Sequence, residues 1–109
     1  MPECNGIPAT IYVRNGRIVG GPQNGQFYMG FLNGGNGQDV IVGTANNEII
    51  HGGNGADIIC GRGGNDLILG QNGPDALYGQ GGNDLLNGGN GQDLCRVGAG
   101  GGFAVQCEL

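Results

Sequence analysis

Hydrophobic and polar positions repeat with a period of nine residues between Gly34 and Arg96. Each of seven consecutive blocks opens with glycine, has an acidic residue at its sixth position and continues with apolar residues at its seventh and eighth positions. A nine-residue block is too short for a helix with its connection, so the pattern predicts a tight turn and a brief strand in each block. The eighth positions are Ile41, Ile50, Ile59, Ile68, Leu77, Leu86 and Cys95.

Two successive blocks predict one coil of 18 residues, in which turn, strand, turn and strand follow one another. Successive coils are expected to stack as a parallel ladder, about 4.8 Å apart. The eighth-position side chains then point inward from both walls, and alternate blocks place their turns on opposite edges. The predicted fold class is all-β, a parallel β-roll (β-solenoid) with two short strands per 18-residue coil.

The blocks, for example GGNGQDVIV from Gly34 and GGNGADIIC from Gly52, follow the pattern Gly-Gly-x-Gly-x-Asp-x-U-x, where U is a large apolar residue. Over residues 34–96 the chain resembles the RTX (repeats-in-toxin) family of hemolysin-type calcium-binding nonapeptide-repeat proteins. The resemblance implies a calcium-binding β-roll. Three regions are expected: an N-terminal cap at 1–33, seven calcium-binding repeats at 34–96 and a C-terminal cap at 97–109.

The acidic residues form two ladders, one on each edge of the predicted roll. Stacked carboxylates repel one another, and Ca²⁺ removes this repulsion because it is a hard cation that takes six to eight oxygen ligands. Three gaps between coils on the first edge and two on the second predict about four to five calcium ions. Zn²⁺ is disfavoured because thiolate and imidazole ligands do not recur with the period, and Mg²⁺ because its octahedral geometry is stricter. The first ladder is Asp39, Asp57, Asp75 and Asp93, and the second is Glu48, Asp66 and Asp84.

The glycine turns are expected to supply the remaining oxygen ligands. Glycines at the first, second and fourth positions permit positive φ angles, which bulky residues avoid, and such turns expose backbone carbonyls to a cation. Glu48 is one methylene longer than the aspartates, so its site departs most from the pattern. The turn residues expected at the metal sites are Gly52, Gly53, Asn54, Gly55, Gly61, Arg62, Gly63, Gly64, Gly70, Gln71, Asn72 and Gly73.

Composition and charge favour folding that depends on the metal. The 28 glycines and four prolines among 109 residues would suggest a disordered linker if they had no period. Ordered glycines lose much backbone freedom, and one inward apolar residue per block makes a thin core. We therefore expect a chain that is largely unfolded without calcium and folds on binding it. The formal charge of −5 then reflects the number of metal ligands and not a basic partner.

The N-terminal region contains two stretches that look like eroded repeats, at 15–21 and 24–30. They are expected to continue the roll as degenerate capping coils without metal. The aromatic residues nearby are interpreted as part of a cap that buries the open end of the stack, since repeat proteins need such caps. An aromatic ligand-binding patch is the alternative. These aromatic residues are Tyr12, Phe27, Tyr28 and Phe31.

Four cysteines allow three pairings. We favour Cys95–Cys107, which would clip the C-terminal tail to the last coil, and Cys4–Cys60, which would pin the N-terminal segment to the roll. Four free thiols are the alternative, although disulfides suit a small chain with little core. Disulfides and a calcium module of the extracellular type both favour a secreted protein. No signal peptide is visible, so Met1 is expected to follow a removed leader.

Residues for other activities are scarce. His51 is the only histidine and is expected to face solvent from a strand, so no catalytic residue, no enzymatic activity and no organic cofactor site is predicted. The four basic residues form no stripe that could bind nucleic acid. No stretch is apolar enough to span a membrane.

The seventh positions should face outward, yet they are apolar throughout. Exposed apolar ladders of this kind often mark contact surfaces. The N-terminal segment is expected to cover one wall, and the other wall could form a homodimer with a second copy. A flat ice-binding face is disfavoured because the walls lack ranks of Thr or Asn. The seventh positions are Val40, Ile49, Ile58, Leu67, Ala76, Leu85 and Leu94.

These features predict a secreted calcium-binding β-roll module that folds on binding Ca²⁺ and has a structural or interaction role. One alternative is an adhesin or surface-layer component that uses an apolar wall of the roll. Another is an accessory domain of a secreted enzyme.

Overall fold

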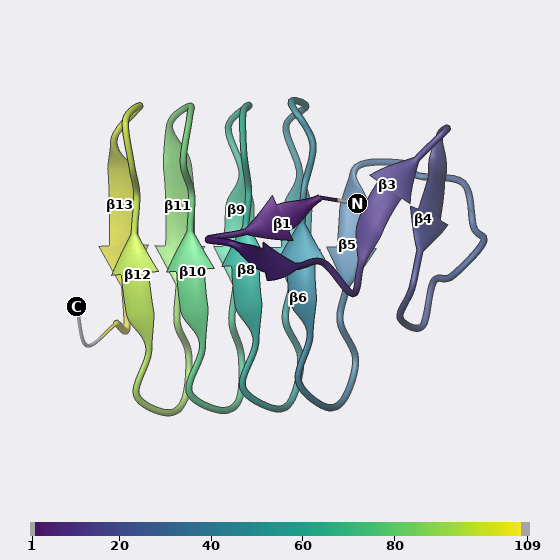
Figure 1. Cartoon of the computed structure of the whole chain (residues 1–109). Helices are drawn as coiled ribbons and strands as arrows, with labels where there is room; N and C mark the ends of the chain where they lie inside the picture. The colour runs from purple at the N-terminus through teal and green to yellow at the C-terminus, as the bar shows by residue number, and fades with distance from the viewer. Residues whose placement is uncertain (1, 108–109) are drawn as a thin grey trace.

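The computed structural model describes residues 2–107 and contains two parallel sheets that face each other across one hydrophobic core (Figure 1). We call them the four-stranded wall and the five-stranded wall. The four-stranded wall consists of β6 (Val40–Val42), β8 (Ile58–Cys60), β10 (Ala76–Tyr78) and β12 (Leu94–Arg96). The five-stranded wall consists of β5 (Phe31–Asn33), β7 (Ile49–His51), β9 (Leu67–Leu69), β11 (Asp84–Asn87) and β13 (Gly102–Val105).

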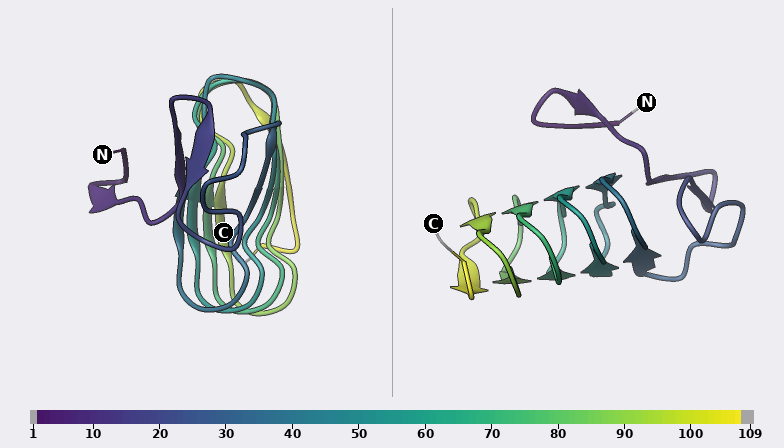
Figure 2. Two further views of the ribbon diagram at one scale, coloured as in Figure 1. Left: turned by 90° about the vertical axis from the view of Figure 1, so that its right-hand side faces the viewer. Right: turned by 90° about the horizontal axis from the view of Figure 1, so that it is seen from below.

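The chain alternates between the two walls, and each strand pairs in parallel with the strand one coil further on. Val40 lies opposite Ile58 in the four-stranded wall, and Ile49 lies opposite Leu67 in the five-stranded wall. Successive coils superimpose when they are viewed along the stack (Figure 2). The predicted parallel β-roll with an 18-residue coil is therefore confirmed.

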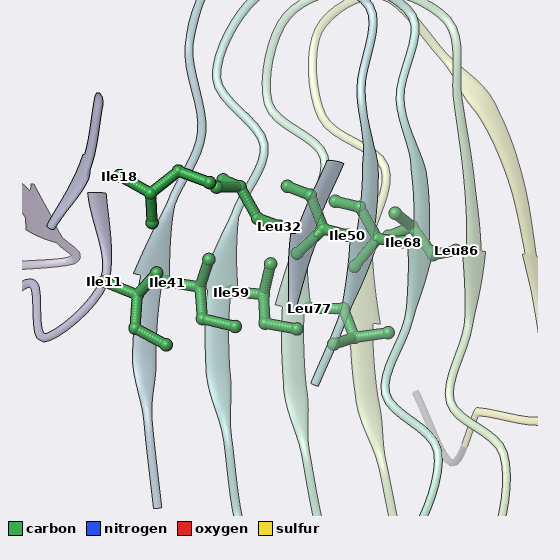
Figure 3. Close-up of a cluster of buried hydrophobic side chains, with 9 residues drawn as sticks. All are labelled: Ile11, Ile18, Leu32, Ile41, Ile50, Ile59, Ile68, Leu77 and Leu86. Atoms are coloured by element: carbon green, nitrogen blue, oxygen red, sulfur yellow. The ribbon is translucent and has the colours of Figure 1, made fainter. Parts of the chain in front are cut away.

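The core is a double row of inward side chains, with one fully buried residue from each strand between β5 and β11 (Figure 3). The eighth-position residues from Ile41 to Leu86 are fully buried, as predicted, whereas Cys95 in the last block is only partly buried. Each buried Ile or Leu side chain contributes about 1.5–3 kcal/mol. Leu32 of β5 extends one row and is also fully buried. The roll thus begins before the first recognisable repeat.

The N-terminal end of the roll is closed by a hairpin of β3 (Tyr12–Arg14) and β4 (Arg17–Val19). Ile11 and Ile18 bring their side chains into the core cluster at this end. Here the structure differs from the predicted coil at 15–21. The reason is the Asn15–Gly16 pair, whose φ angles of 54° and 74° suit the tight type I′ turn of an antiparallel hairpin.

The outer face of the four-stranded wall is covered by the N-terminal segment. The short antiparallel pair β1 (Glu3–Cys4) and β2 (Ile7–Pro8) lies over β6 and β8 (Figure 2). A second buried cluster joins Cys4, Ala9 and Tyr12 to Val42 and Cys60 of the wall. The N-terminal segment therefore covers this wall, as predicted, over β6 and β8.

Two disulfides hold the ends of the chain to the roll, with the pairing favoured from the sequence. Cys4–Cys60 attaches β1 to β8 with a Cα–Cα distance of 5.6 Å, and Cys95–Cys107 has a Cα–Cα distance of 5.9 Å. Both distances are normal for a disulfide. Residues 97–109, expected as a cap, include β13, which adds a further strand to the five-stranded wall. Within residues 2–107 no helix is long and apolar enough to cross a membrane.

Candidate metal centre: the two carboxylate ladders

Each aspartate of the repeats turns its carboxylate toward its own glycine turn, and from Asp57 onward one carboxylate oxygen accepts a backbone N–H of the preceding coil. On the first edge the backbone N–H of Asp39 donates to Asp57 Oδ1 at 2.8 Å, and that of Asp57 donates to Asp75 Oδ1 at 2.8 Å. On the second edge the backbone N–H of Asp66 donates to Asp84 Oδ1 at 2.8 Å. The structure therefore brings the predicted acids together in two ladders, each linked coil to coil.

In five of these aspartates the second carboxylate oxygen is buried without a protein donor. A buried, unpaired polar atom costs about 1–3 kcal/mol, and a charged one costs more. A hard cation is the kind of partner that would offset this cost, because it binds carboxylate oxygens directly. Within residues 2–107, the buried Oδ2 atoms that accept no hydrogen bond include those of Asp39, Asp57, Asp66, Asp75 and Asp84.

At most of the turns, a backbone carbonyl from the next coil faces the same point as the Oδ2 atom. An ideal Cβ built on Gly52 would lie 2.9 Å from Asp57 Oδ2 and 2.9 Å from the carbonyl oxygen of Gly70. At Gly61 the corresponding distances are 2.6 Å to Asp66 Oδ2 and 3.1 Å to the carbonyl oxygen of Gly79. Two oxygens from different coils thus converge where only a glycine leaves room.

This convergence changes the expected role of the first glycine in each block. Positive φ angles were expected at the first, second and fourth positions, but the first position does not adopt one. Gly52 is instead required by space, because a side chain there would meet the carboxylate and the carbonyl. Positive φ is found at the second and fourth positions, for example 87° at Gly53 and 103° at Gly55.

Some second positions adopt positive φ although they are not glycine. Arg62 has a φ of 68° and Gln71 a φ of 72°. For a residue with a side chain, this conformation costs roughly 1–2 kcal/mol. Left-handed residues held by surrounding structure cluster at functional loops, including ligand clamps. The turns therefore keep one backbone shape despite its cost at these positions.

The predicted turn residues divide into two groups. The first-position carbonyls of Gly52, Gly61 and Gly70 face the carboxylate side, whereas the carbonyl of Gly53 accepts the backbone N–H of Asn72 at 3.1 Å. The side chains of Asn54 and Asn72 are joined in an exposed amide ladder, in which Asn72 Nδ2 donates to Asn54 Oδ1 at 2.8 Å. This ladder was not predicted. Its sequence signal was an asparagine at the third position of alternate blocks, namely Asn36, Asn54, Asn72 and Asn90.

Burial raises the pKa of the ladder carboxyls. For Asp66, burial and then the charges of Glu48 and Asp84 raise the pKa to about 7. Burial is also the main cause that raises the pKa of Asp75 to about 7, although a backbone hydrogen bond from Asp57 opposes it. The pKa of Asp57 rises to about 6 for the same main reason, and burial raises the pKa of Asp39 and Asp84. The ladders thus hold protons near neutral pH or need a cation.

The donor set fits calcium better than softer metals. All four cysteines are in disulfides and offer no thiolate, and His51 packs edge-on against Phe31 with a centroid distance of 5.1 Å. Within residues 2–107 no three groups from His, Cys, Asp and Glu cluster at one point. Backbone carbonyls must therefore complete each site, and Ca²⁺ accepts such mixed oxygen ligands in flexible geometry.

Glu48 is the exception in the ladders, because its carboxylate already has protein donors. Thr44 donates to it from its backbone N–H, at 2.9 Å to Oε1, and from Oγ1, at 2.8 Å to Oε2. The Tyr28 hydroxyl also donates to Oε2. Tyr28 and Thr44 were not identified as partners of Glu48, although the block GTANNE differs from both neighbouring blocks at every position from the second to the sixth.

The outer face of the five-stranded wall is open, in contrast to the covered wall. Ile49 is 44% exposed and Leu85 is 42% exposed. A shallow cavity of about 680 Å³ runs over β7, β9 and β11, with Met29 and Phe103 among its lining residues. The apolar seventh positions predicted to face outward therefore do so on this wall.

Fold and site together define a parallel β-roll whose turns bring together carboxylate and carbonyl oxygens, the ligand types that a hard divalent cation prefers. The model of the RTX calcium-binding nonapeptide repeat (4 copies) matches residues 33–68, 61–95 and 69–103, and the chain belongs to this family. Repeats of this family bind calcium. Comparison with curated proteins and with solved structures found no match.

Proposed function

We propose that the chain is a secreted calcium-binding β-roll module that folds on binding about four to five calcium ions and serves a structural or interaction role. One observation carries the proposal. The buried Oδ2 atoms have no protein donor, yet each of those at Asp57, Asp66 and Asp75 converges with a carbonyl oxygen of the next coil.

The residues that would hold the ions are those of the two ladders. On the second edge they are the carboxylates of Asp66 and Asp84, and on both edges the carbonyls of the glycine turns complete the sites. On the first edge the carboxylates are those of Asp39, Asp57, Asp75 and Asp93. A bound cation supplies positive charge that neutralises the stacked carboxylates and joins successive coils. The chain's own contribution is positional, since the hydrogen bonds to Oδ1 hold each carboxylate and the first glycine keeps space beside Oδ2.

Folding on binding follows from the weakness of the other forces. Each coil buries only two large side chains in the main core, while many of the 28 glycines must be ordered. The burial that raises the pKa of Asp66 and Asp75 to about 7 destabilises the folded state when these groups are ionised. Metal binding can supply the missing free energy, as it does in other small metal-dependent domains.

Secretion is supported by the two disulfides, which persist in oxidising compartments. It is also supported by the family, whose members are typically extracellular. Calcium modules of the extracellular type bind at roughly 10⁻⁴–10⁻³ M, which suits the calcium level outside cells.

A non-catalytic role is part of the proposal. The carboxylates that could act as acid and base are tied to the ladders by their Oδ1 hydrogen bonds. His51 contacts Phe31 and lies within hydrogen-bonding distance of Gln71. These side chains are better explained by their structural contacts than by a reaction.

Calcium titration tests the proposal. Far-UV circular dichroism should show a sheet signal that grows with calcium, and calorimetry should count about four to five ions per chain. Asp75→Asn is the informative variant, because the carboxylate of Asp75 is buried in the ladder and accepts the backbone N–H of Asp57. Glu3→Gln is the matched control, because Glu3 is exposed in β1 and lies outside the ladders. A chain that binds no calcium, or whose sheet is equally complete in metal-stripped buffer, would refute it.

The interaction role has one candidate surface, the open five-stranded wall. Its exposed residues Ile49 and Leu85, with Met29 and Phe103 nearby, are apolar and could contact a second copy, as an adhesin or surface-layer component would. Sedimentation with and without calcium tests self-association, and Leu85→Ser should abolish it. An unchanged monomer in both conditions would argue against the homodimer.

A further inference from the structure

The carboxylate of Glu48 has the hydrogen-bond donors that its counterparts in the ladders lack. Three groups of the chain donate to it, namely the backbone N–H and Oγ1 of Thr44 and the hydroxyl of Tyr28. The Tyr28 hydroxyl also lies 3.1 Å from Thr44 Oγ1, so the three side chains form one network. By contrast, Asp66 Oδ2, one coil further along the same edge, is buried without a donor.

The extra methylene of Glu48 places this carboxylate where the other turns have space. Its Oε1 atom lies against Gly43, at the point that the Oδ2 atom and the next-coil carbonyl share in other blocks. The carbonyl oxygen of Gly61 is 2.8 Å from the same ideal Cβ position. The carboxylate therefore occupies the position on which the oxygens of the other turns converge.

The turn that carries Glu48 also has a different backbone. Its second and fourth positions, Thr44 and Asn46, do not adopt the positive φ angles of the other turns. Thr44 Oγ1 instead accepts the backbone N–H of Asn46 at 3.1 Å, in a side-chain-stabilised turn. This turn is held by hydrogen bonds of its own side chains, Thr44 and Glu48.

Apolar packing and a disulfide also hold the same end of the roll. Tyr28 packs against the core cluster, to which the hairpin β3–β4 contributes Ile18 and the preceding residue Ile11. The Cys4–Cys60 disulfide joins the N-terminal segment to β8. At the other end, by contrast, all four residues of β13 are exposed.

We infer that Tyr28 and Thr44 take the place of a cation at Glu48, so that the N-terminal end of the roll is ordered without calcium and serves as the template for the calcium-dependent coils. This inference rests on the proposed function. The ordered part comprises β3, β4, β5, β6 and β7. Later coils add to its open strand edges, which removes the cost of forming the first parallel pairing for each of them.

Hydrogen–deuterium exchange of the disulfide-intact protein tests this inference. In metal-stripped buffer, amides of residues 11–50 should be protected and those of 61–105 should exchange freely, and calcium should protect the second group. Tyr28→Phe removes a hydrogen bond to a charged group, so protection of 11–50 without metal should fall about tenfold or more. Tyr78→Phe, on the four-stranded wall away from Glu48, is the matched control and should leave it unchanged.

A second variant should gain a calcium site at the Glu48 turn. Glu48→Asp combined with Thr44→Gly and Asn46→Gly converts the turn to the pattern of its neighbours, and calorimetry should count one more calcium ion per chain than for the natural sequence. An unchanged count, or uniform free exchange of the natural chain without metal, would overturn the inference. Failure of every variant to bind calcium would instead contradict the proposed function, and protection of 11–50 without metal would still support the present inference.

Discussion

The burial of the ladder carboxylates predicts an unusual dependence of stability on pH in the metal-free protein. The pKa of Asp66 rises from 3.8 to about 7 on folding, with burial as the main cause. Because the folded pKa lies above the unfolded one, the folded state favours the protonated carboxyl. The cost of ionising it is fully present above pH 7 and vanishes below about pH 4.

The magnitude is large relative to the stability of a small domain. A rise from 3.8 to about 7 corresponds to about 4 kcal/mol of folding free energy for one carboxyl. Whole domains are stable by only about 5–15 kcal/mol. Metal-free protein should therefore become more stable as the pH falls from 7.5 to about 4.5, opposite to ordinary acid unfolding. With calcium the trend reverses, because protons compete with the cation for the carboxylates.

Urea unfolding followed by far-UV circular dichroism measures this effect, since the chain contains no tryptophan for fluorescence. In metal-stripped buffer the calcium-dependent coils are unfolded at pH 7.5, so their sheet signal and their resistance to urea should grow as the pH falls to 4.5, whereas in excess calcium the urea midpoints are compared directly at the two pH values. Asp66→Asn serves as the control, because it removes one of the buried charges and should reduce the metal-free pH dependence, with Asp57 and Asp75 accounting for the remainder. If acidification of the metal-free protein brings no gain in sheet signal or in resistance to urea, the carboxylates are not buried as described and the reasoning is refuted.

Three further predictions concern the turns, the disulfides and the core. Gly52→Ala should weaken calcium binding and destabilise the roll, because the added Cβ would lie 2.9 Å from both Asp57 Oδ2 and a carbonyl oxygen. Gly81→Ala is the control, because the nearest atom to its added Cβ is 3.8 Å away, and its calcium affinity measured by calorimetry should change little. Replacing Cys4 and Cys60 by Ser should cost about 4 kcal/mol in calcium-loaded urea unfolding, against about 3 kcal/mol for the shorter loop of the second disulfide; equal losses would contradict this. Ile68→Ala should cost about 2–5 kcal/mol at its fully buried site, and a loss below 1 kcal/mol would argue against the core row.

The nine-residue period predicted the roll because it repeats every feature that a coil needs. It places Ile59 inward and Ile58 outward, and it assigns Asp57 and Asp66 to opposite edges, as observed. The Cys4–Cys60 disulfide could be predicted for a related reason, because the side chain of Cys60, at the ninth position of its block, points away from the core. A repeated pattern fixes register, and register determines which residues can meet.

The features that could not be predicted from the sequence lie where the nine-residue period is weak, or where close packing between coils determines which residue fits. The hairpin around Asn15 and Gly16 has its own local turn signal, which competes with the faint repeat pattern of 15–21. The contact of Tyr28 with Glu48 joins an irregular segment to a repeat, so the repeat spacing does not predict it. The role of Gly52 depends on the approach of an atom from the next coil, which only the assembled roll reveals.

Crystals grown in millimolar calcium test the central claim most directly, through anomalous difference maps recorded at a wavelength where calcium scatters anomalously. The account predicts peaks inside the turns, each within about 2.3–2.6 Å of an aspartate Oδ2 atom and of a glycine carbonyl oxygen from the adjacent coil. It also predicts no peak at the Glu48 turn, where Tyr28 and Thr44 already donate to the carboxylate. Maps without peaks at the turns of Asp57, Asp66 and Asp75 would contradict the claim that a cation joins the coils of this roll.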